Sequence, residues 1–166
     1  MKRLATWMAV GLALVTGVWL GMRLFSGPEH VIRGRLAKLA REASFKPGEA
    51  PLAKISHVSN LRSYFAPGIT IRVNLEQGGI QTIEGREDLM EGLAGVRGNL
   101  PGLELEFLDT QIEMSPNRDS ATVVLTLRYR LGREKEPGLQ ELKLALQKSE
   151  GFWQVSRVEN VNALSR

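Results

Sequence analysis

The sequence predicts a small α+β domain with one core, held to a membrane by a single N-terminal helix. Three observations carry this prediction: an uncharged apolar run opens the chain, stripes of apolar residues at helical spacing come next, and the C-terminal part alternates with a period of two. The 166 residues leave about one domain's worth of chain after the leading run. Because the sequence has no cysteine, disulfides, zinc–thiolate sites, iron–sulfur clusters and cysteine nucleophiles are excluded.

The N-terminal run has the length and the ends of a membrane-spanning helix. No charge occurs from Leu4 to Met22, a stretch that covers about 28 Å as a helix, close to the roughly 30 Å hydrocarbon core. We therefore expect a basic tail (1–3), a transmembrane signal-anchor helix (4–25) and a linker (26–28) before the domain. Bulky residues come after the run where a cleavage site needs small ones, so we expect the anchor to stay uncleaved. The expected membrane-interface residues are Lys2, Arg3, Trp7, Trp19 and Arg23.

The net charge of +4 is concentrated beside this run. Residues 1–46 hold eight Lys or Arg and two Glu, whereas the rest of the chain holds fourteen basic and sixteen acidic residues, for a net charge of −2. Such a distribution fits anionic lipid headgroups, and we expect no nucleic-acid binding. The Lys and Arg count predicts a cytoplasmic domain, but the short basic tail resembles a bacterial signal-anchor, which exports the domain behind it. We favour a bacterial inner-membrane protein with an exported domain, and the sequence leaves the orientation open.

Two helices are predicted at the start of the domain, which covers residues 29–164. The first has one apolar stripe at positions i, i+4, i+7 and i+11, and its basic residues occupy the other faces. A second helix is expected from Pro51 to Phe65 with a continuous apolar side, and a Pro-Gly pair stops it. The stripes are Ile32, Leu36, Leu39 and Ala43, then Leu52, Ile55, Val58, Leu61 and Phe65.

A hairpin and a third helix come next. Alternating apolar residues on both sides of Gln77-Gly78-Gly79 predict two antiparallel strands with a reversal at the glycines. The third helix begins near Glu87 and Asp88, where the helix dipole favours acids. Its apolar stripe is Leu89, Leu93, Val96 and Leu100. Glycine lowers helix propensity, so we expect Gly92, Gly95 and Gly98 to mark close packing against a sheet.

From Leu103 onward the apolar period is two, which predicts four strands. The parity of the first strand jumps near Phe107 and Leu108, as a β-bulge would cause. The second strand, from Ala121 to Leu131, shows the clearest alternation of apolar and polar residues. The apolar positions of the last two strands are Leu142, Leu144 and Leu146, then Trp153, Val155, Val158 and Val161, with a second change of parity.

This order, ααββαββββ, and three short segments resemble the nuclear transport factor 2-like superfamily, particularly its SnoaL-like branch. The segments are Gly85–Leu89 (GREDL), Leu100–Leu105 (LPGLEL) and Gly151–Val158 (GFWQVSRV). The resemblance covers residues 29–164 and implies a cystatin-like cone, in which a curled sheet wraps around helices and leaves a pocket at its open end. Enzymes of this superfamily, such as ketosteroid isomerase, place carboxylates or tyrosines inside the cone.

The inward positions of this sequence are nearly all apolar, and the strand acids Glu104, Glu106 and Glu113 fall on the outward parity. We therefore predict no catalytic residue and no cofactor. No metal site is expected either, because His30 and His57 stand far apart without cysteine between them. Asp109 could act as a base if it pointed inward, but a surface aspartate is the favoured interpretation. The remaining pocket candidates are His57, Tyr64, Asp109, Tyr129 and Asn160.

Two functions remain as hypotheses. The favoured one is a membrane-anchored protein-binding or assembly module, with a protein partner or a second copy at the sheet face. Scaffold subunits of bacterial type IV secretion machines, which belong to the same superfamily, share this layout of one anchor and one cone domain. The alternative is an anchored SnoaL-like enzyme or a binder of a small apolar ligand in the cone. An enclosed cavity with an ionisable group would favour the alternative.

Overall fold

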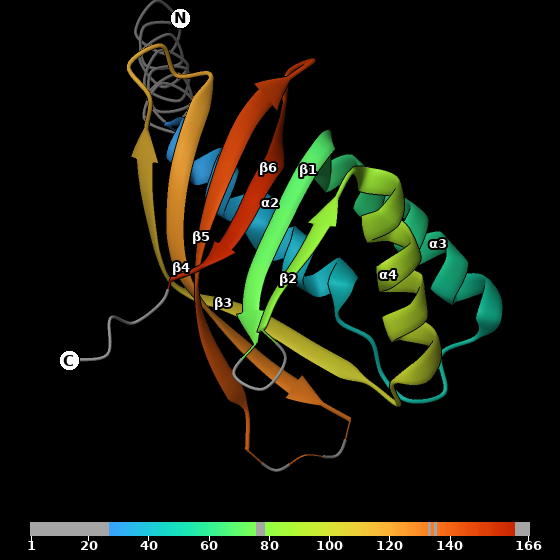
Figure 1. Ribbon diagram of the computed structural model, residues 1–166. Coiled ribbons are helices and arrows are strands. Elements are labelled where there is room, and N and C mark those ends of the chain that lie inside the picture. The colour runs from blue at the N-terminus through green and yellow to red at the C-terminus, as the bar shows by residue number, and fades with distance from the viewer. Residues whose placement is uncertain (1–26, 76–78, 133, 135, 162–166) are drawn as a thin grey trace, which may run out of the picture. The chain divides into compact units, whose positions relative to one another are not determined.

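Helices and strands succeed one another in the predicted order along the chain (Figure 1). The computed structural model describes residues 27–75, 79–132, 134 and 136–161. The elements are α2 (Pro28–Ala43), α3 (Pro51–Leu61), a 3-10 turn (Arg62–Tyr64), β1 (Phe65–Leu75), β2 (Gly79–Glu84), α4 (Arg86–Asn99), β3 (Leu103–Met114), β4 (Ser120–Leu131), β5 (Gly138–Ser149) and β6 (Phe152–Asn160).

The expected signal-anchor helix over 4–25, its interface residues and the first two residues of the Gln77-Gly78-Gly79 reversal lie outside the described residues. Within the described part of the chain, no helix is long and apolar enough to cross a membrane.

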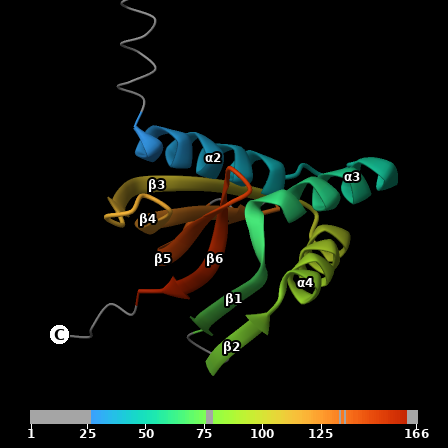
Figure 2. The same cartoon turned by 90° about the horizontal axis from the view of Figure 1, so that it is seen from above.

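The six strands form one sheet in the order β2-β1-β6-β5-β4-β3. The β1–β6 pair is parallel, and every other pair is antiparallel. Helix α2 lies across one face of the sheet, and α3 and α4 lie near β1 and β2 (Figure 2). This arrangement has the helices on one face of a curled sheet, as the resemblance implied, and leaves the opposite face without a described helix.

The core lies between α2 and the sheet. Three residues of the predicted α2 stripe, Ile32, Leu36 and Leu39, are buried and pack with the inward residues of β4, β5 and β6, whereas Ala43 is half-buried and Ala40 is buried in addition. Burying one such aliphatic side chain contributes about 1.5–3 kcal/mol. The strand residues of this core are Phe65 and Ile69 on β1, and Ala121, Val123, Leu125, Leu142, Leu144, Leu146, Trp153 and Val155 on β4, β5 and β6. The helix-facing side of the sheet is therefore filled with apolar side chains.

Two register shifts explain the changes of parity in the sequence. The β3–β4 register slips between Leu108 and Gln111, and Asp109 takes a left-handed conformation with φ of 47°. The predicted bulge is thus confirmed, slightly beyond the expected position, and it lets Phe107 and Ile112 both pack on the core. A second shift between Ala145 and Leu146 accounts for the parity change in β6.

The prediction for the second helix was partly wrong. Helix α3 ends at Leu61, and Phe65 already belongs to β1. Of its expected apolar side, Leu61 is buried but Leu52 and Ile55 are 82% and 68% exposed. The physical reason is that α3 packs chiefly on α4, so the sheet does not cover the side chains of its first turns.

The expectation for the glycines of the third helix was wrong. A Cβ atom added at Gly92, Gly95 or Gly98 would meet no atom within 4 Å. Helix α4 instead buries Leu89, Met90 and Arg97, which lie on the opposite side of the helix by its 3.6-residue period.

Candidate functional site

The sheet face opposite α2 carries two adjacent rows of paired residues across five strands. Paired residues share a face, and so do residues two apart on one strand, so both rows lie on the open face. In the order β1, β6, β5, β4 and β3, the first row is Thr70, Arg157, Ala145, Thr122 and Glu113. The second row is Arg72, Glu159, Lys143, Val124 and Gln111. We call this surface the open sheet face.

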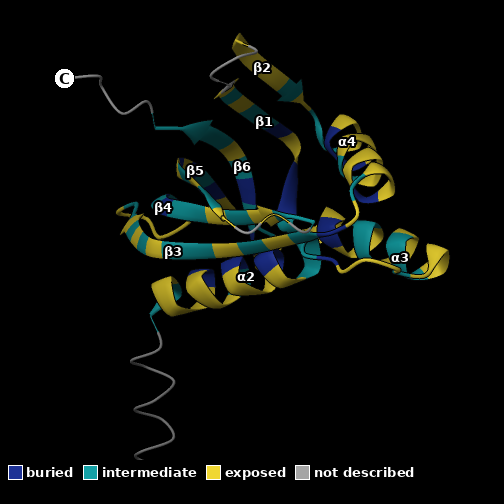
Figure 3. Ribbon diagram, turned by 90° about the horizontal axis from the view of Figure 1, so that it is seen from below, coloured by how far each residue is buried: buried dark blue, intermediate teal, exposed yellow. Residues whose placement is uncertain are grey.

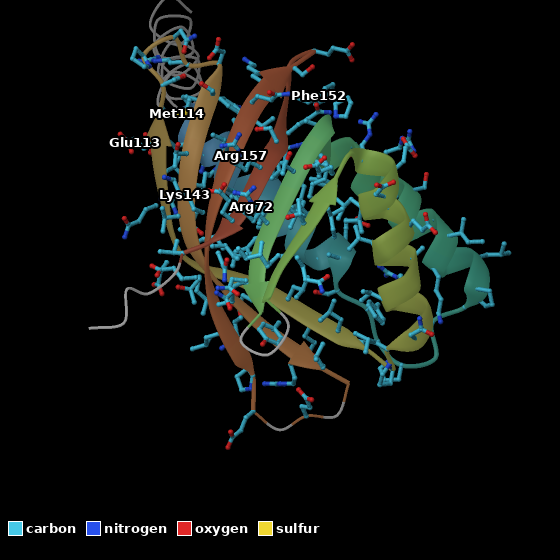
Figure 4. The ribbon with its side chains drawn as sticks, viewed as in Figure 1. Arg72, Glu113, Met114, Lys143, Phe152 and Arg157 are labelled. Carbon is cyan, nitrogen blue, oxygen red and sulfur yellow. The ribbon has the colours of Figure 1, made fainter. Side chains whose placement is uncertain are left out.

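Three exposed cations lie at the centre of the open sheet face, namely Arg72, Lys143 and Arg157 (Figure 4). Two acids lie among these cations: Glu159 stands between Arg72 and Lys143 in its row, and Glu141 is exposed two residues from Lys143 on β5, so this part of the face carries a net charge of +1. None of these five residues forms an ion pair with another described residue. Glu113 on β3 and Glu84 on β2 add negative charge at the outer strands. The face therefore carries mixed charges, with its three cations on β1, β6 and β5.

A shallow hollow of about 460 Å³ opens at one end of this face. Its polar lining comes from four strands and the turn after β3, and Arg157 follows the lining residue Ser156 in the sequence. The Ser156 hydroxyl donates a hydrogen bond to the Ala145 carbonyl over 3.2 Å, which holds the second register shift in place. The residues whose hydroxyl, amide or carboxylate groups line it are Glu113, Ser115, Ser120, Thr122, Gln147 and Ser156.

A second groove of about 450 Å³ lies between the end of α2 and strands β3 and β4. The Tyr129 ring lies over Gly138, where an added Cβ would come within 2.3 Å of the ring Cζ. Arg128 pairs with Glu106, and Arg130 with Glu104 at 3.2 Å, so arginines hold the carboxylates that line this groove. Both pairs are at least two-fifths exposed and contribute little to stability.

A polar cluster ties the helices together around Arg97, which is only 3% exposed. Its guanidinium donates to both carboxylate oxygens of Glu49, at 2.7 and 2.8 Å, and to the Glu42 carbonyl at 3.1 Å. It also lies 4.9 Å from the centre of the Phe45 ring. Hydrogen bonding from Arg97 lowers the pKa of the Glu49 carboxyl below its usual range, and partial burial opposes this shift.

Arg97 was not among the residues predicted to matter. A signal was present, because Arg97 lies at i+8 from Leu89 and at i+4 from Leu93 on the apolar stripe of α4. A charged residue on the apolar side of a helix indicates a buried charge, which needs an oppositely charged partner. The sequence alone does not show which residue that partner is. That partner, Glu49, lies in the loop before α3, 48 residues earlier.

The predicted pocket residues lie in separate places. His57 contacts the Glu42 and Glu49 carboxylates at 3.0 and 3.6 Å, beside Arg97. Tyr64 lies under the Arg35 guanidinium, 4.6 Å from the ring centre.

The other three candidates are near neither of these. Asp109 is exposed at the bulge, and Tyr129 lines the groove at the end of α2. The Asn160 amide bonds the backbone N–H and carbonyl of Asn74, each at 3.0 Å. Among the described residues, no hydrogen bond or ion pair joins any two of the five candidates, and no group of three His, Asp or Glu could hold a metal ion. Within the described part of the chain, the five candidates therefore do not come together at one site.

Comparisons with known proteins identify the fold. No family model matches the chain, and no curated protein matches its sequence. Among solved structures, a protein of unknown function from Pseudomonas putida, described as NTF2-like, has a TM-score of 0.62 at 13% identity, over 81% of this chain and 86% of that one. An NTF2-like protein with a cystatin-like fold from Novosphingobium aromaticivorans has a TM-score of 0.59 at 16% identity, over 90% and 91%.

A third solved structure, a putative scytalone dehydratase from Novosphingobium aromaticivorans, has a TM-score of 0.57 at 14% identity, over 84% of this chain and 89% of that one. Identities this low speak for the fold alone. The chain thus has the α+β fold shared by nuclear transport factor 2-like and cystatin-like proteins.

Proposed function

We propose that this protein is a membrane-tethered module that binds a protein partner through its open sheet face. One observation carries the proposal: Arg72, Lys143 and Arg157 are exposed at the centre of a sheet face that no described helix covers, and none has an ionic partner among the described residues. A surface of this charge fits an acidic patch on the partner, because complementary potentials raise the association rate and select the partner.

The size of the open sheet face also supports binding. Five strands spaced about 4.8 Å apart span roughly 19 Å, and strands of nine to twelve residues run about 30 Å or more. These dimensions enclose several hundred Å², on the order of the ~800 Å² that each partner contributes to a standard interface. The mixed charges of the face are typical of a partner that binds and dissociates rather than of an obligate, apolar interface.

A second copy of the chain is the competing occupant of this face. Two copies meeting centre to centre would bring Arg72, Lys143 and Arg157 of each copy close to those of the other, which opposes pairing unless the copies are offset so that Glu113 meets Arg157. We therefore favour a different, acidic protein over a homodimer.

The tether is part of the proposal. The uncharged run over 4–22 and the expected interface residues support a single-pass anchor over 4–25, and the short basic tail, which resembles a bacterial signal-anchor, favours an inner membrane with the domain exported. Extraction of washed membranes with alkaline carbonate should leave the protein in the pellet. Release by carbonate would rule out the span, and a reporter fused after Arg166 would determine the orientation.

The binding test uses the full chain in detergent, captured after cross-linking in its native host. The charge-reversal variant Arg72→Glu/Lys143→Glu/Arg157→Glu should lose at least tenfold of the co-purified partner, since close charge pairs across interfaces contribute about 1.5 kcal/mol or more. The matched control, Arg33→Glu/Lys38→Glu/Arg41→Glu on α2, should retain it. Equal recovery with both variants would reject this face as the interface, and recovery of a second copy alone would favour the homodimer.

The alternative function, a SnoaL-like enzyme or a binder of a small apolar ligand, has one supporting observation. The 450 Å³ groove combines the Tyr129 hydroxyl and the apolar side chains Phe45, Leu103 and Leu105 with charged residues of α2, β3 and β4, a lining that would suit a small molecule with an apolar body and polar substituents. A screen of steroid-like and polyketide-like compounds by ligand-observed NMR tests it. Binding that Tyr129→Ala abolishes would establish this alternative.

A further inference from the structure

We propose that the outward face of α2 contacts anionic lipid headgroups, so that one side of the domain rests on the bilayer surface. The contact residues are Arg33, Lys38 and Arg41. This inference rests on the proposed tether, which places α2 beside the membrane, and it is independent of the protein partner.

The geometry of α2 places these three cations on one side of the helix. Its buried residues Ile32, Leu36 and Leu39 face the sheet. Ala40 is buried as well. With 100° between successive residues, Lys38 and Arg41 fall on the half of the helix away from the buried residues, beside the small residues Gly34 and Ala37, and Arg33 lies at the edge of that half, on the side toward β3. All five are exposed, and buried and exposed residues alternate along α2 in Figure 3. The three cations lie within nine residues, about 12 Å along the helix axis, and so can meet one flat surface together.

The charges on this side of α2 are uncompensated. Arg35, on the same helix, is turned inward, where it donates to the backbone carbonyls of Trp153 and Ser63. By contrast, Arg33, Lys38 and Arg41 make no side-chain hydrogen bond or ion pair with another described residue.

The nearby acids are already engaged. A hollow between α2 and β3 is lined by Arg33, Arg41 and Glu106. The Glu106 carboxylate there pairs with Arg128. Glu42, in the last turn of α2, contacts His57. The outward face therefore presents its positive charge to whatever lies next to it.

The chain just before α2 indicates the occupant of this face. The apolar run reaches Met22, and only Arg23–Gly27 separates it from the start of α2 at Pro28. A helix that begins this close to a membrane span lies within the range of the negative surface potential of a bilayer. Since the chain from residue 47 onward has a net charge of −2, the attraction would act on α2 rather than on the domain as a whole. The open sheet face lies on the other side of the sheet, so this contact leaves it accessible to a protein partner.

The experiment uses the lack of cysteine in the chain, which makes a single introduced thiol unique. Full-length protein carrying Ala37→Cys, on the outward face of α2, is reconstituted in two kinds of vesicle. One contains only neutral phosphatidylcholine, and the other also contains about 30% phosphatidylglycerol, which makes its surface anionic. The rate of maleimide labelling of the thiol is measured in both. Gln147→Cys, exposed on the sheet, is the control position.

We expect the anionic lipid to slow labelling at Ala37→Cys by at least about tenfold, because each Lys or Arg near an anionic surface contributes about a factor of five. Labelling at Gln147→Cys should not change, and high salt should abolish the difference. Adding Arg33→Gln/Lys38→Gln/Arg41→Gln should remove the slowing, whereas Arg72→Gln/Lys143→Gln/Arg157→Gln should preserve it.

Two failures are distinguishable. If the protein resists carbonate extraction from the vesicles but labels equally fast in both lipids, the α2 contact is wrong and the tether stands. If carbonate releases the protein, the tether fails and this inference fails with it. Slowing that persists in the α2 triple variant would also overturn the assignment.

Discussion

Two regions of the domain are stabilised in different ways. Between α2 and strands β4, β5 and β6, apolar side chains fill the interface, and inward strand residues such as Val123, Leu125 and Val155 are at most 2% exposed. In the region of α3, α4 and β2, only one residue of α3 is buried and five of the six β2 residues are exposed. Buried Arg97 and its Glu49 partner connect the helices there. The difference teaches that most buried apolar side chains belong to α2 and the sheet, while α3 and α4 add Leu61, Leu89 and Met90 to the same core and are joined by the Arg97–Glu49 pair.

The largest effect should come from a cavity in the sheet core. Leu125 is 1% exposed. We expect Leu125→Ala to lower the free energy of unfolding by about 2–5 kcal/mol, through lost burial and the cavity left behind. The matched change in the helical region, Ile55→Ala, removes a 68% exposed side chain and should cost less than about 0.5 kcal/mol. Urea denaturation followed by circular dichroism measures both. Similar losses for the two variants would contradict the comparison.

The next effect tests the polar connection in the helical region. Arg97→Ala should destabilise the domain by about 3 kcal/mol, because it leaves the largely buried Glu49 carboxylate without its partner. The double variant Arg97→Met/Glu49→Leu should recover much of this loss, since apolar replacement of a buried pair is often close to neutral. A control pair is Arg62–Glu87, which is exposed, so Arg62→Ala should change stability by less than about 1 kcal/mol. Additive effects at Arg97 and Glu49 would show that the two residues are not coupled.

Two glycines sharpen the comparison at a smaller scale. Gly132 comes directly after β4 with φ of 53°, and an added Cβ would lie 2.7 Å from Cγ of Pro101. Gly132→Ala should therefore cost about 1–3 kcal/mol. Gly92 in α4 has open space around it, so Gly92→Ala should raise stability by about 0.5–1 kcal/mol through helix propensity. Thermal unfolding of both variants distinguishes a required glycine from a replaceable one.

The smallest effect is the pH dependence of the Glu49 contact. Because the folded-state pKa of Glu49 is lowered from 4.5, its stabilisation is complete above the unfolded pKa and is lost as pH falls through the folded value. The stability gap between the natural protein and Glu49→Gln should therefore be constant near neutral pH and shrink below about pH 4.5. Denaturation series at several pH values measure the gap. A stability gap that widened as the pH fell would show that the folded-state pKa of Glu49 is raised rather than lowered.

The sheet core could be predicted from the sequence more closely than the helical region. The alternation of apolar and polar residues from Ala121 to Leu131 predicts a strand with one covered face, because such a strand buries every second residue. The bulge near Asp109 could also be predicted, because one extra residue in a strand shifts its apolar side chains from odd to even positions. The exposure of Leu52 and Ile55 could not be predicted, because an apolar stripe on a helix does not show whether a sheet or another helix covers it.

The sequence by itself determined the order of elements, the parity of the strands and the location of the excess positive charge, because periodicity and charge are local properties of the chain. Only the tertiary structure decided which residues meet. It brought Arg97 to Glu49, and it aligned Arg72, Lys143 and Arg157 on one face from three strands. The physical reason is that strand order and register, set by long-range pairing, determine which distant side chains become neighbours, and no local pattern encodes them.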